Sequence, residues 1–357
     1  MGGYLIRPDN TPARARFPVV DLHNHLWARW ESLDGVVQIM DQTGVAAYCD
    51  LTANLTVEWG GGGYILRQGD IGEFFRSTSR FPGRFLGFTA ATFGQARDEP
   101  LFQDASEFVD QTIRVLRDHV SRGARGLKIL KELGLIWRDA SGRLVSPDDP
   151  RLFEIWEEAG RLGIPVLIHQ ADPIGFFDPV TPENEHYDSL QKYPDWSFCD
   201  RQRFPSHSEL LERLENLIAS HRTTTFLLPH GANWPENLEW LDGLLERHPN
   251  VYLDFSARLD ELGRQPYSAR EFHIRHQDRI YFGTDMPASP EMYRFHWRFY
   301  ETYDEHFIPP DYDGTFGRHR WKVCGIGLPD DVLRKLYYGN ALKIIPGLRE
   351  QLAGKVS

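Results

Sequence analysis

The sequence has few cysteines and no long apolar segment, and both absences narrow the class of protein. Its three cysteines, Cys49, Cys199 and Cys324, are odd in number and widely spaced, which indicates neither a disulfide framework nor a thiolate zinc site. No segment offers the roughly 20 consecutive apolar residues that a membrane-spanning helix needs. The first residues lack the charged and apolar parts of a signal peptide. We therefore expect a cytoplasmic protein with reduced thiols and no membrane association.

Basic residues are scarce relative to acidic ones. Lys and Arg number 40 against 51 Asp and Glu, so the formal net charge is -11, and no basic run is present. Because contact with a phosphate backbone requires clustered Lys and Arg, a nucleic-acid partner is not expected. The 41% of hydrophobic residues can fill a core. These features favour an enzyme that acts on a small molecule.

The sequence does contain a series of apolar, strand-like segments separated by helical stretches. Eight can be counted, at 19–25, 45–52, 84–91, 124–130, 164–168, 224–229, 251–256 and 279–284. Buried strands that alternate with helices are typical of a closed parallel barrel, so the predicted fold is an α/β (β/α)8 TIM barrel. The active site of such a barrel lies where the C-terminal ends of the strands meet.

The length predicts one elaborated domain. A plain barrel has roughly 250 residues, and 357 residues leave about 100 for long active-site loops and a C-terminal helical extension. We predict a single domain over residues 1–357, with barrel strands at about 17–285 and a C-terminal lid and helices at 286–357. The segments 170–207 and 286–310 are rich in aromatic residues. Trp196 is a candidate for contact with a flat or cyclic substrate.

Metal-binding residue types follow several of the predicted strands. His23 and His25 close the first strand and, being two apart, share one of its faces. His169 ends the fifth strand, His230 the sixth and Asp285 the eighth. Other histidines precede a strand, at the opposite end of the barrel, and are predicted to be structural: His119, His221, His248, His273 and His276.

Together with Gly283-Thr284-Asp285 and Tyr338-Gly339-Asn340-Ala341, these residues resemble the amidohydrolase superfamily. The resemblance runs through most of the chain. It is strongest to the amidohydrolase-related branch, which includes the decarboxylases of aminocarboxymuconate semialdehyde and of γ-resorcylate. It implies a metal-dependent hydrolase or carboxy-lyase with its metal at the C-terminal end of the barrel.

Three imidazoles and a carboxylate suit one divalent ion, for which we predict zinc, with manganese as the alternative. We assign His23, His25, His169 and Asp285 as its ligands. His230 resembles the residue that stands beside the metal in mononuclear relatives, where it acts as a general base or polarises the substrate. Its alternative role is to bind a second metal. Asp285 is also predicted to transfer the proton.

Two cationic side chains have open roles. Lys128, on the fourth strand, matches the lysine that becomes carboxylated and bridges two metals in binuclear superfamily members. It can instead bind a substrate carboxylate or form a core ion pair. Arg258, just past the seventh strand, is placed either to fix an anionic group of the substrate or to form a salt bridge with a loop carboxylate.

The resemblance supports two reactions. The first is hydrolysis, in which a metal-activated water attacks a small, cyclic or aromatic substrate that carries a carboxylate. The alternative is non-oxidative decarboxylation of an aromatic or enolisable acid, since the motif residues are common to both. A non-catalytic barrel with a structural metal is the third hypothesis. A homodimer that pairs through barrel helices is the predicted assembly.

Overall fold

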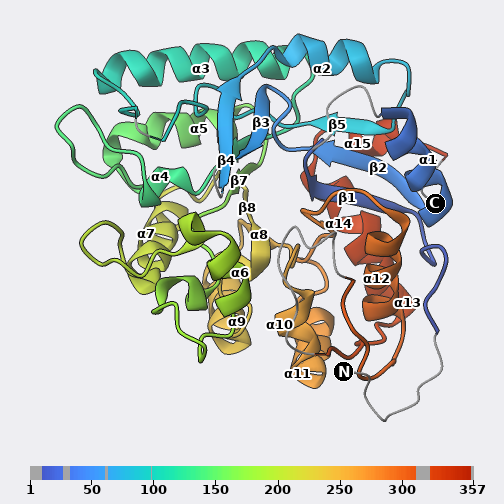
Figure 1. The fold of residues 1–357 in the computed structure, drawn as a ribbon. Helices are drawn as coiled ribbons and strands as arrows, with labels where there is room; N and C mark the ends of the chain where they lie inside the picture. The colour runs from blue at the N-terminus through green and yellow to red at the C-terminus, as the bar shows by residue number, and fades with distance from the viewer. Residues whose placement is uncertain (1–9, 27–32, 61–62, 98, 311–321, 355–357) are drawn as a thin grey trace.

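A computed structural model describes residues 10–26, 33–60, 63–97, 99–310 and 322–354. Its parallel strands form two sheets with the orders β1-β2-β5 and β6-β7-β8-β9 (Figure 1). The strands of these sheets are β1 (Val19–Asn24), β2 (Val45–Asp50), β5 (Phe85–Gly87), β6 (Leu127–Ile129), β7 (Val166–Ile168), β8 (Phe226–Leu228) and β9 (Val251–Leu253). Each strand lies beside the one that precedes it in this series, as expected when helices connect successive parallel strands.

Backbone hydrogen bonds join the two sheets at the β5–β6 seam. Thr89, two residues past β5, forms a parallel bridge with Leu127. The amide of Thr89 donates to the carbonyl of Gly126 at 2.9 Å, and the amide of Lys128 donates to the carbonyl of Thr89 at 2.8 Å. The two sheets therefore continue into one another on this side.

The segment 279–284 closes the other side. Ile280 forms a parallel bridge with Leu253 of β9. On its opposite edge, the carbonyl of His23 accepts hydrogen bonds from the amides of Thr284 (3.1 Å) and Asp285 (2.8 Å). The first and last segments of the barrel are thus neighbours, and the predicted closed α/β barrel is confirmed.

Most strands are shorter than the sequence predicted. The fourth to seventh strands have three residues each, and 279–284 contributes a single bridge rather than a ladder. Several predicted strands run into a residue with positive φ: Ala91 (46°), His230 (60°), Ala257 (51°) and Asp285 (50°). A left-handed residue turns the chain out of the extended conformation that a ladder needs, which ends the strand at the rim of the barrel.

Helices surround the barrel and connect its strands (Figure 1). Capping side chains fix several of their starts; Asp104, for example, accepts from the amide of Glu107 at the start of α3. The helices are α1 (Leu33–Thr43), α2 (Ile71–Thr78), α3 (Ala105–Ser121), α4 (Glu132–Leu135), α5 (Phe153–Arg161), α6 (Tyr187–Lys192), α7 (His207–Ser220), α8 (Pro229–Ala232), α9 (Leu238–Arg247), α10 (Leu259–Gly263), α11 (Pro266–Arg275), α12 (Pro290–Glu301), α13 (Asp330–Arg334), α14 (Asn340–Ile344) and α15 (Leu348–Gln351). Within the described ranges, none of these is both long and apolar enough to cross a bilayer.

An antiparallel hairpin was not predicted. It consists of β3 (Leu55–Gly60) and β4 (Gly63–Gln68), which lie between β2 and α2 in the chain. Gly60 pairs with Gly63 at its tip. Because the hairpin follows the C-terminal end of β2, it lies on the side of the barrel where the site is expected.

The C-terminal helices close the opposite end of the barrel. Apolar side chains of α14 and α15, including Ala341, Ile344 and Leu348, pack onto a buried cluster that draws on five strands. The side chain of Asn340 donates to the carbonyls of Gln277 (2.8 Å) and Ile280 (2.7 Å). The Tyr338-Gly339-Asn340-Ala341 motif therefore fastens the C-terminal helices to the start of the last barrel segment.

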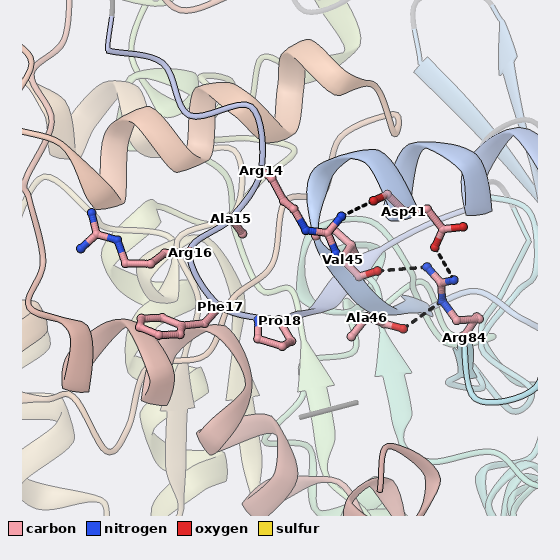
Figure 2. Close-up of a pocket in the computed structure, with 10 residues that line it drawn as sticks. Arg14, Ala15, Arg16, Phe17, Pro18, Asp41, Val45, Ala46 and Arg84 are labelled. Carbon is pink, nitrogen blue, oxygen red and sulfur yellow. Dashed lines mark hydrogen bonds and ion pairs between the residues drawn. The ribbon is translucent and has the colours of Figure 1, made fainter. Parts of the chain in front are cut away.

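A pocket of about 340 Å³ lies at this same end, lined by residues 14–18, 44–46, Asp41 and Arg84. The guanidinium of Arg84 donates to Asp41 (2.6 Å) and to the carbonyls of Val45 and Ala46 (both 3.1 Å) (Figure 2). Arg14 donates to the carbonyl of Asp41. These bonds join the α1–β2 connection to the start of β5, so the charges of the pocket stabilise the barrel itself.

Candidate functional site

Three of the predicted residues form a compact group at the C-terminal ends of the strands. Ligand atoms of His23, His230 and Asp285 all lie within 4.8 Å of one another. Oδ1 of Asp285 is 3.7 Å from Nε2 of His23 and 3.4 Å from Nε2 of His25. The other oxygen, Oδ2, is 3.6 Å from Nε2 of His230. The two carboxylate oxygens therefore face different partners.

These distances fit a metal ion. Two atoms that bind one tetrahedral ion at about 2.0–2.1 Å are about 3.3–3.4 Å apart. The spacing from Oδ1 of Asp285 to His23 and His25 is close to this value. Nε2 of His23 and Oδ1 of Asp285 are buried and have no hydrogen-bond partner within the described part of the chain. Buried polar atoms normally have a partner, and a bound ion would provide one here.

Hydrogen bonds to Nδ1 fix the ring orientation of two histidines of the site. Nδ1 of His25 lies 2.9 Å from Oγ1 of Thr52, and Nδ1 of His230 lies 2.8 Å from the carbonyl of Ser256. Burial lowers the pKa of His25 and of His230 well below the usual value for histidine. Both rings are therefore neutral at pH 7, the form in which histidine binds metals.

His169 follows β7 and lies beside His230. The ring centroids of the two residues are 4.5 Å apart, and Nε2 of His169 is 3.6 Å from Oδ1 of Asp172. It does not belong to the compact group of His23, His230 and Asp285. Its role as a metal ligand stays a prediction.

Lys128 is fully buried on β6, inside the barrel. Its Nζ has no hydrogen-bond partner among the residues that the structure describes, and these residues form no ion pair with it. Burial lowers its pKa to about 8, although the charges of Asp285, Asp254 and Glu132 act in the opposite direction. The structure therefore shows no partner for the core ion pair that was one of the three hypotheses.

Arg258 is half-buried and lies between β9 and α10. One terminal nitrogen donates to the carbonyl of Ala257 at 2.6 Å, whereas Nε is buried without a partner within the described ranges. These ranges contain no salt bridge of Arg258, which was the alternative to its predicted substrate contact. Its positive charge lies close enough to lower the pKa of His230 further, after burial and the charge of His169.

Trp196 lies in a short 3-10 turn, η4 (Pro194–Trp196), in the long segment after β7. Its half-buried ring stacks with Tyr193 at 4.4 Å and with Phe176 at 6.0 Å between ring centroids. This stack stiffens the segment, and contact between Trp196 and the substrate stays a prediction.

The histidines predicted to be structural lie at helix ends or in pairs away from the site. His248, for example, follows the last residue of α9 and pairs with Glu215.

Sequence reasoning missed several polar residues that surround the site. Lys131 is buried and forms an ion pair with Asp172 beside His169. Asp254 bonds to His23, and Asp50 bonds to the Thr52 that contacts His25. The available signal was the position of each acidic residue, within four residues of the C-terminal end of a predicted strand.

The sequence model of a protein family, described as amidohydrolase, matches residues 20–346 of the chain. The chain belongs to the amidohydrolase family. Its members are metal-dependent enzymes of the amidohydrolase superfamily, so the predicted superfamily is confirmed, and membership implies a divalent metal. The hypothesis of a non-catalytic barrel is correspondingly wrong.

Solved structures of similar fold include three TIM-barrel relatives, each of low identity. An uncharacterised TIM-barrel protein from Bordetella bronchiseptica is 15% identical with a TM-score of 0.51, and covers 90% of this chain and 85% of its own. A dihydroxybenzoic acid decarboxylase from Polaromonas sp. JS666, with bound manganese, is 14% identical with a TM-score of 0.52. The match covers 94% of this chain and 99% of the decarboxylase. A 2,6-dihydroxybenzoate decarboxylase from Rhizobium is 16% identical with a TM-score of 0.51. The match covers 92% of this chain and 98% of that decarboxylase. The search of curated proteins found no match.

Proposed function

We propose that this amidohydrolase-family enzyme is a metal-dependent decarboxylase of an aromatic acid. The observation that carries the proposal is the pair of cations beside the histidines, Lys128 and Arg258. Each has a buried nitrogen without a partner in the described part of the chain. A buried cation is costly unless it is paired, and a substrate carboxylate or phenolate would give each of these nitrogens a direct hydrogen-bond partner. Two proteins of similar fold are decarboxylases of dihydroxybenzoic acids.

The proposed metal ligands are His23, His25, His169 and Asp285, with Asp285 binding through Oδ1. Zinc suits three imidazoles and one carboxylate, and manganese is the alternative; the Polaromonas protein holds manganese. When bound, the ion would act as a Lewis acid toward an oxygen of the substrate.

The chain's own residues would divide the remaining work. Lys128 and Arg258 would bind the anionic groups and orient the ring. Oδ2 of Asp285 and Nε2 of His230, 3.6 Å apart, would hold the proton that is transferred. This proton adds to the ring carbon that bears the carboxylate. The bond to the carboxylate then breaks, carbon dioxide leaves, and the electron pair of that bond restores the aromatic ring.

The first test is a panel of hydroxylated benzoic acids, beginning with 2,6-dihydroxybenzoate, incubated with the metal-loaded enzyme. We expect release of carbon dioxide, and in D₂O the product should carry one deuterium at the carbon that lost the carboxylate. A parallel panel of lactones and amides tests the hydrolytic alternative. Hydrolysis of a member of that panel, without carbon dioxide from any acid, would contradict the decarboxylase.

The hydrolytic alternative is favoured by one observation: Nζ of Lys128, beside the histidines, has no hydrogen-bond partner among the described residues. A carboxylated lysine at this place would bridge two metal ions, with His169 and His230 as ligands of the second. Such a site would make the enzyme a binuclear hydrolase.

Replacing Lys128 by methionine separates these two roles. If Lys128 binds the substrate, we expect one metal per chain in both proteins and a KM for the acid that rises about 10- to 100-fold, because one charged hydrogen bond is lost. Elemental analysis and steady-state kinetics provide the readouts. Lys343→Met, on the exposed face of α14, is the control. Two metals in the wild type, falling to one or none in Lys128→Met, would instead establish the binuclear site.

A further inference from the structure

Asp254, just past β9, is fully buried and accepts hydrogen bonds from two other segments of the barrel. Its Oδ2 lies 2.9 Å from Nδ1 of His23. Its Oδ1 accepts from the amides of His230 (3.2 Å) and Ser256 (2.8 Å) and from the hydroxyl of Ser256 (2.6 Å). One carboxylate therefore contacts both a histidine of β1 and the backbone of a histidine that follows β8.

The contact with His23 determines which ring nitrogen carries the proton. An ionised carboxylate can accept hydrogen bonds but cannot donate them. Nδ1 of His23 must therefore be the protonated nitrogen, and the lone pair of Nε2 points toward Asp285, 3.7 Å away. The opposite tautomer would place a hydrogen on the atom proposed to bind the metal, and would remove that ligand.

The contacts with His230 act on its backbone. His230 begins four consecutive residues with positive φ, from 50° to 66°, that end at Asn233. Such a conformation is costly for residues other than glycine and needs support from its surroundings. Asp254 gives this support twice, because Oδ1 accepts from the amide of His230 and the Asp254 carbonyl accepts from the amide of Gly231 at 2.7 Å.

We propose that Asp254 is the positioning residue of this site, which sets the tautomer of His23 and the backbone conformation that presents His230. The proposal rests on the proposed metal site, which it deepens. It predicts that a single buried carboxylate controls metal affinity, through His23, together with the placement of the residue proposed to move the proton. Asp254 would act only through these two histidines and is not itself a proposed ligand of the metal or of the substrate.

Asp254→Asn is the decisive variant, because an amide has the same shape but accepts through one oxygen only. Whichever way the amide is turned, its NH₂ group faces donors, either Nδ1 of His23 or the amides of His230 and Ser256. We expect the zinc affinity, measured by competition with a chelator, to fall about 10- to 100-fold. The visible absorption of the cobalt-substituted protein should also change. Asp304→Asn is the matched control, since Asp304 is buried but binds Asn10 and Arg298 away from the site.

The tautomer of His23 provides a test that needs no folded Asp254 variant. We expect ¹⁵N spectra of the metal-free wild type to show the Nδ1-protonated form, with the resonance assigned through His23→Gln. The Nε2-protonated form would overturn the inference, as would equal zinc affinity and identical cobalt spectra for Asp254→Asn and wild type. If the wild type binds no metal, the proposed function fails, and the tautomer alone then decides whether Asp254 positions His23.

Discussion

Replacing His25 by alanine is expected to lower the affinity of the protein for zinc by about 100-fold or more. His25 places Nε2 at 3.4 Å from Oδ1 of Asp285, and its Nδ1 is held by Thr52. Loss of a direct ligand should cost at least as much as the 10- to 100-fold effect of losing an outer partner of a ligand. The affinity is measured by chelator competition on protein stripped of metal.

The control for this variant is His119→Ala. His119 lies near the end of α3, where it bonds to Thr89 and has no part in the proposed metal site. It should leave the zinc affinity unchanged. If His25→Ala binds zinc as tightly as the control does, the proposed ligand set is wrong.

Replacing His230 by asparagine is expected to lower kcat about 10²- to 10⁴-fold while zinc still binds. The imidazole faces Oδ2 of Asp285, whereas His23 and His25 face Oδ1, and this separation fits the proposed role of His230 in proton transfer. Asparagine is the suitable replacement, because it tolerates the left-handed backbone that His230 adopts with φ of 60°. The rate is measured with whichever acid of the panel releases carbon dioxide, on protein of verified metal content.

Because His230 lies in the compact group with His23 and Asp285, this variant also tests whether His230 binds the metal. If His230→Asn loses zinc as severely as His25→Ala does, His230 is a metal ligand and the proton must be moved by another group. His273→Asn serves as the control, since His273 is equally buried but bonds to the carbonyl of Ala269 within α11.

The barrel and the identities of the central residues could be predicted because both depend on local pattern. Apolar runs that alternate with helical stretches indicate parallel strands, and parallel strands bring their C-terminal ends together. That rule alone was enough to place His23, His230 and Asp285 in one region, although the chain separates the first from the last by more than two hundred residues. The structure brings all three within 4.8 Å of one another.

The supporting residues could not be predicted, because their partners are distant in sequence. Asp254 bonds to a histidine 231 positions away. Before the fold was known, it was one of 51 acidic residues, and burial, which separates it from the others, is a property of the folded chain. The ion pair of Lys131 with Asp172 could not be predicted for the same reason.

The exact ends of the strands also escaped prediction, for a different physical reason. His230, Ala257 and Asp285 adopt positive φ although none of them is glycine. Their intrinsic preference is for extended or right-handed backbone, so nothing in the local sequence indicates the sharp turn of the chain directly after these predicted strands. Tertiary hydrogen bonds, such as those of Asp254 to His230, supply what local preference does not.

The bond that closes the barrel has a consequence for how the protein is made. The carbonyl of His23 accepts from the amides of Thr284 and Asp285, so the first strand finds its final neighbour in a segment synthesised much later. A nascent chain that has emerged from the ribosome through β9 still lacks both the closing segment and the Asp285 carboxylate. Domains fold from the N-terminus as they are synthesised, but the group of His23, His230 and Asp285 can assemble only after the last barrel segment has been made.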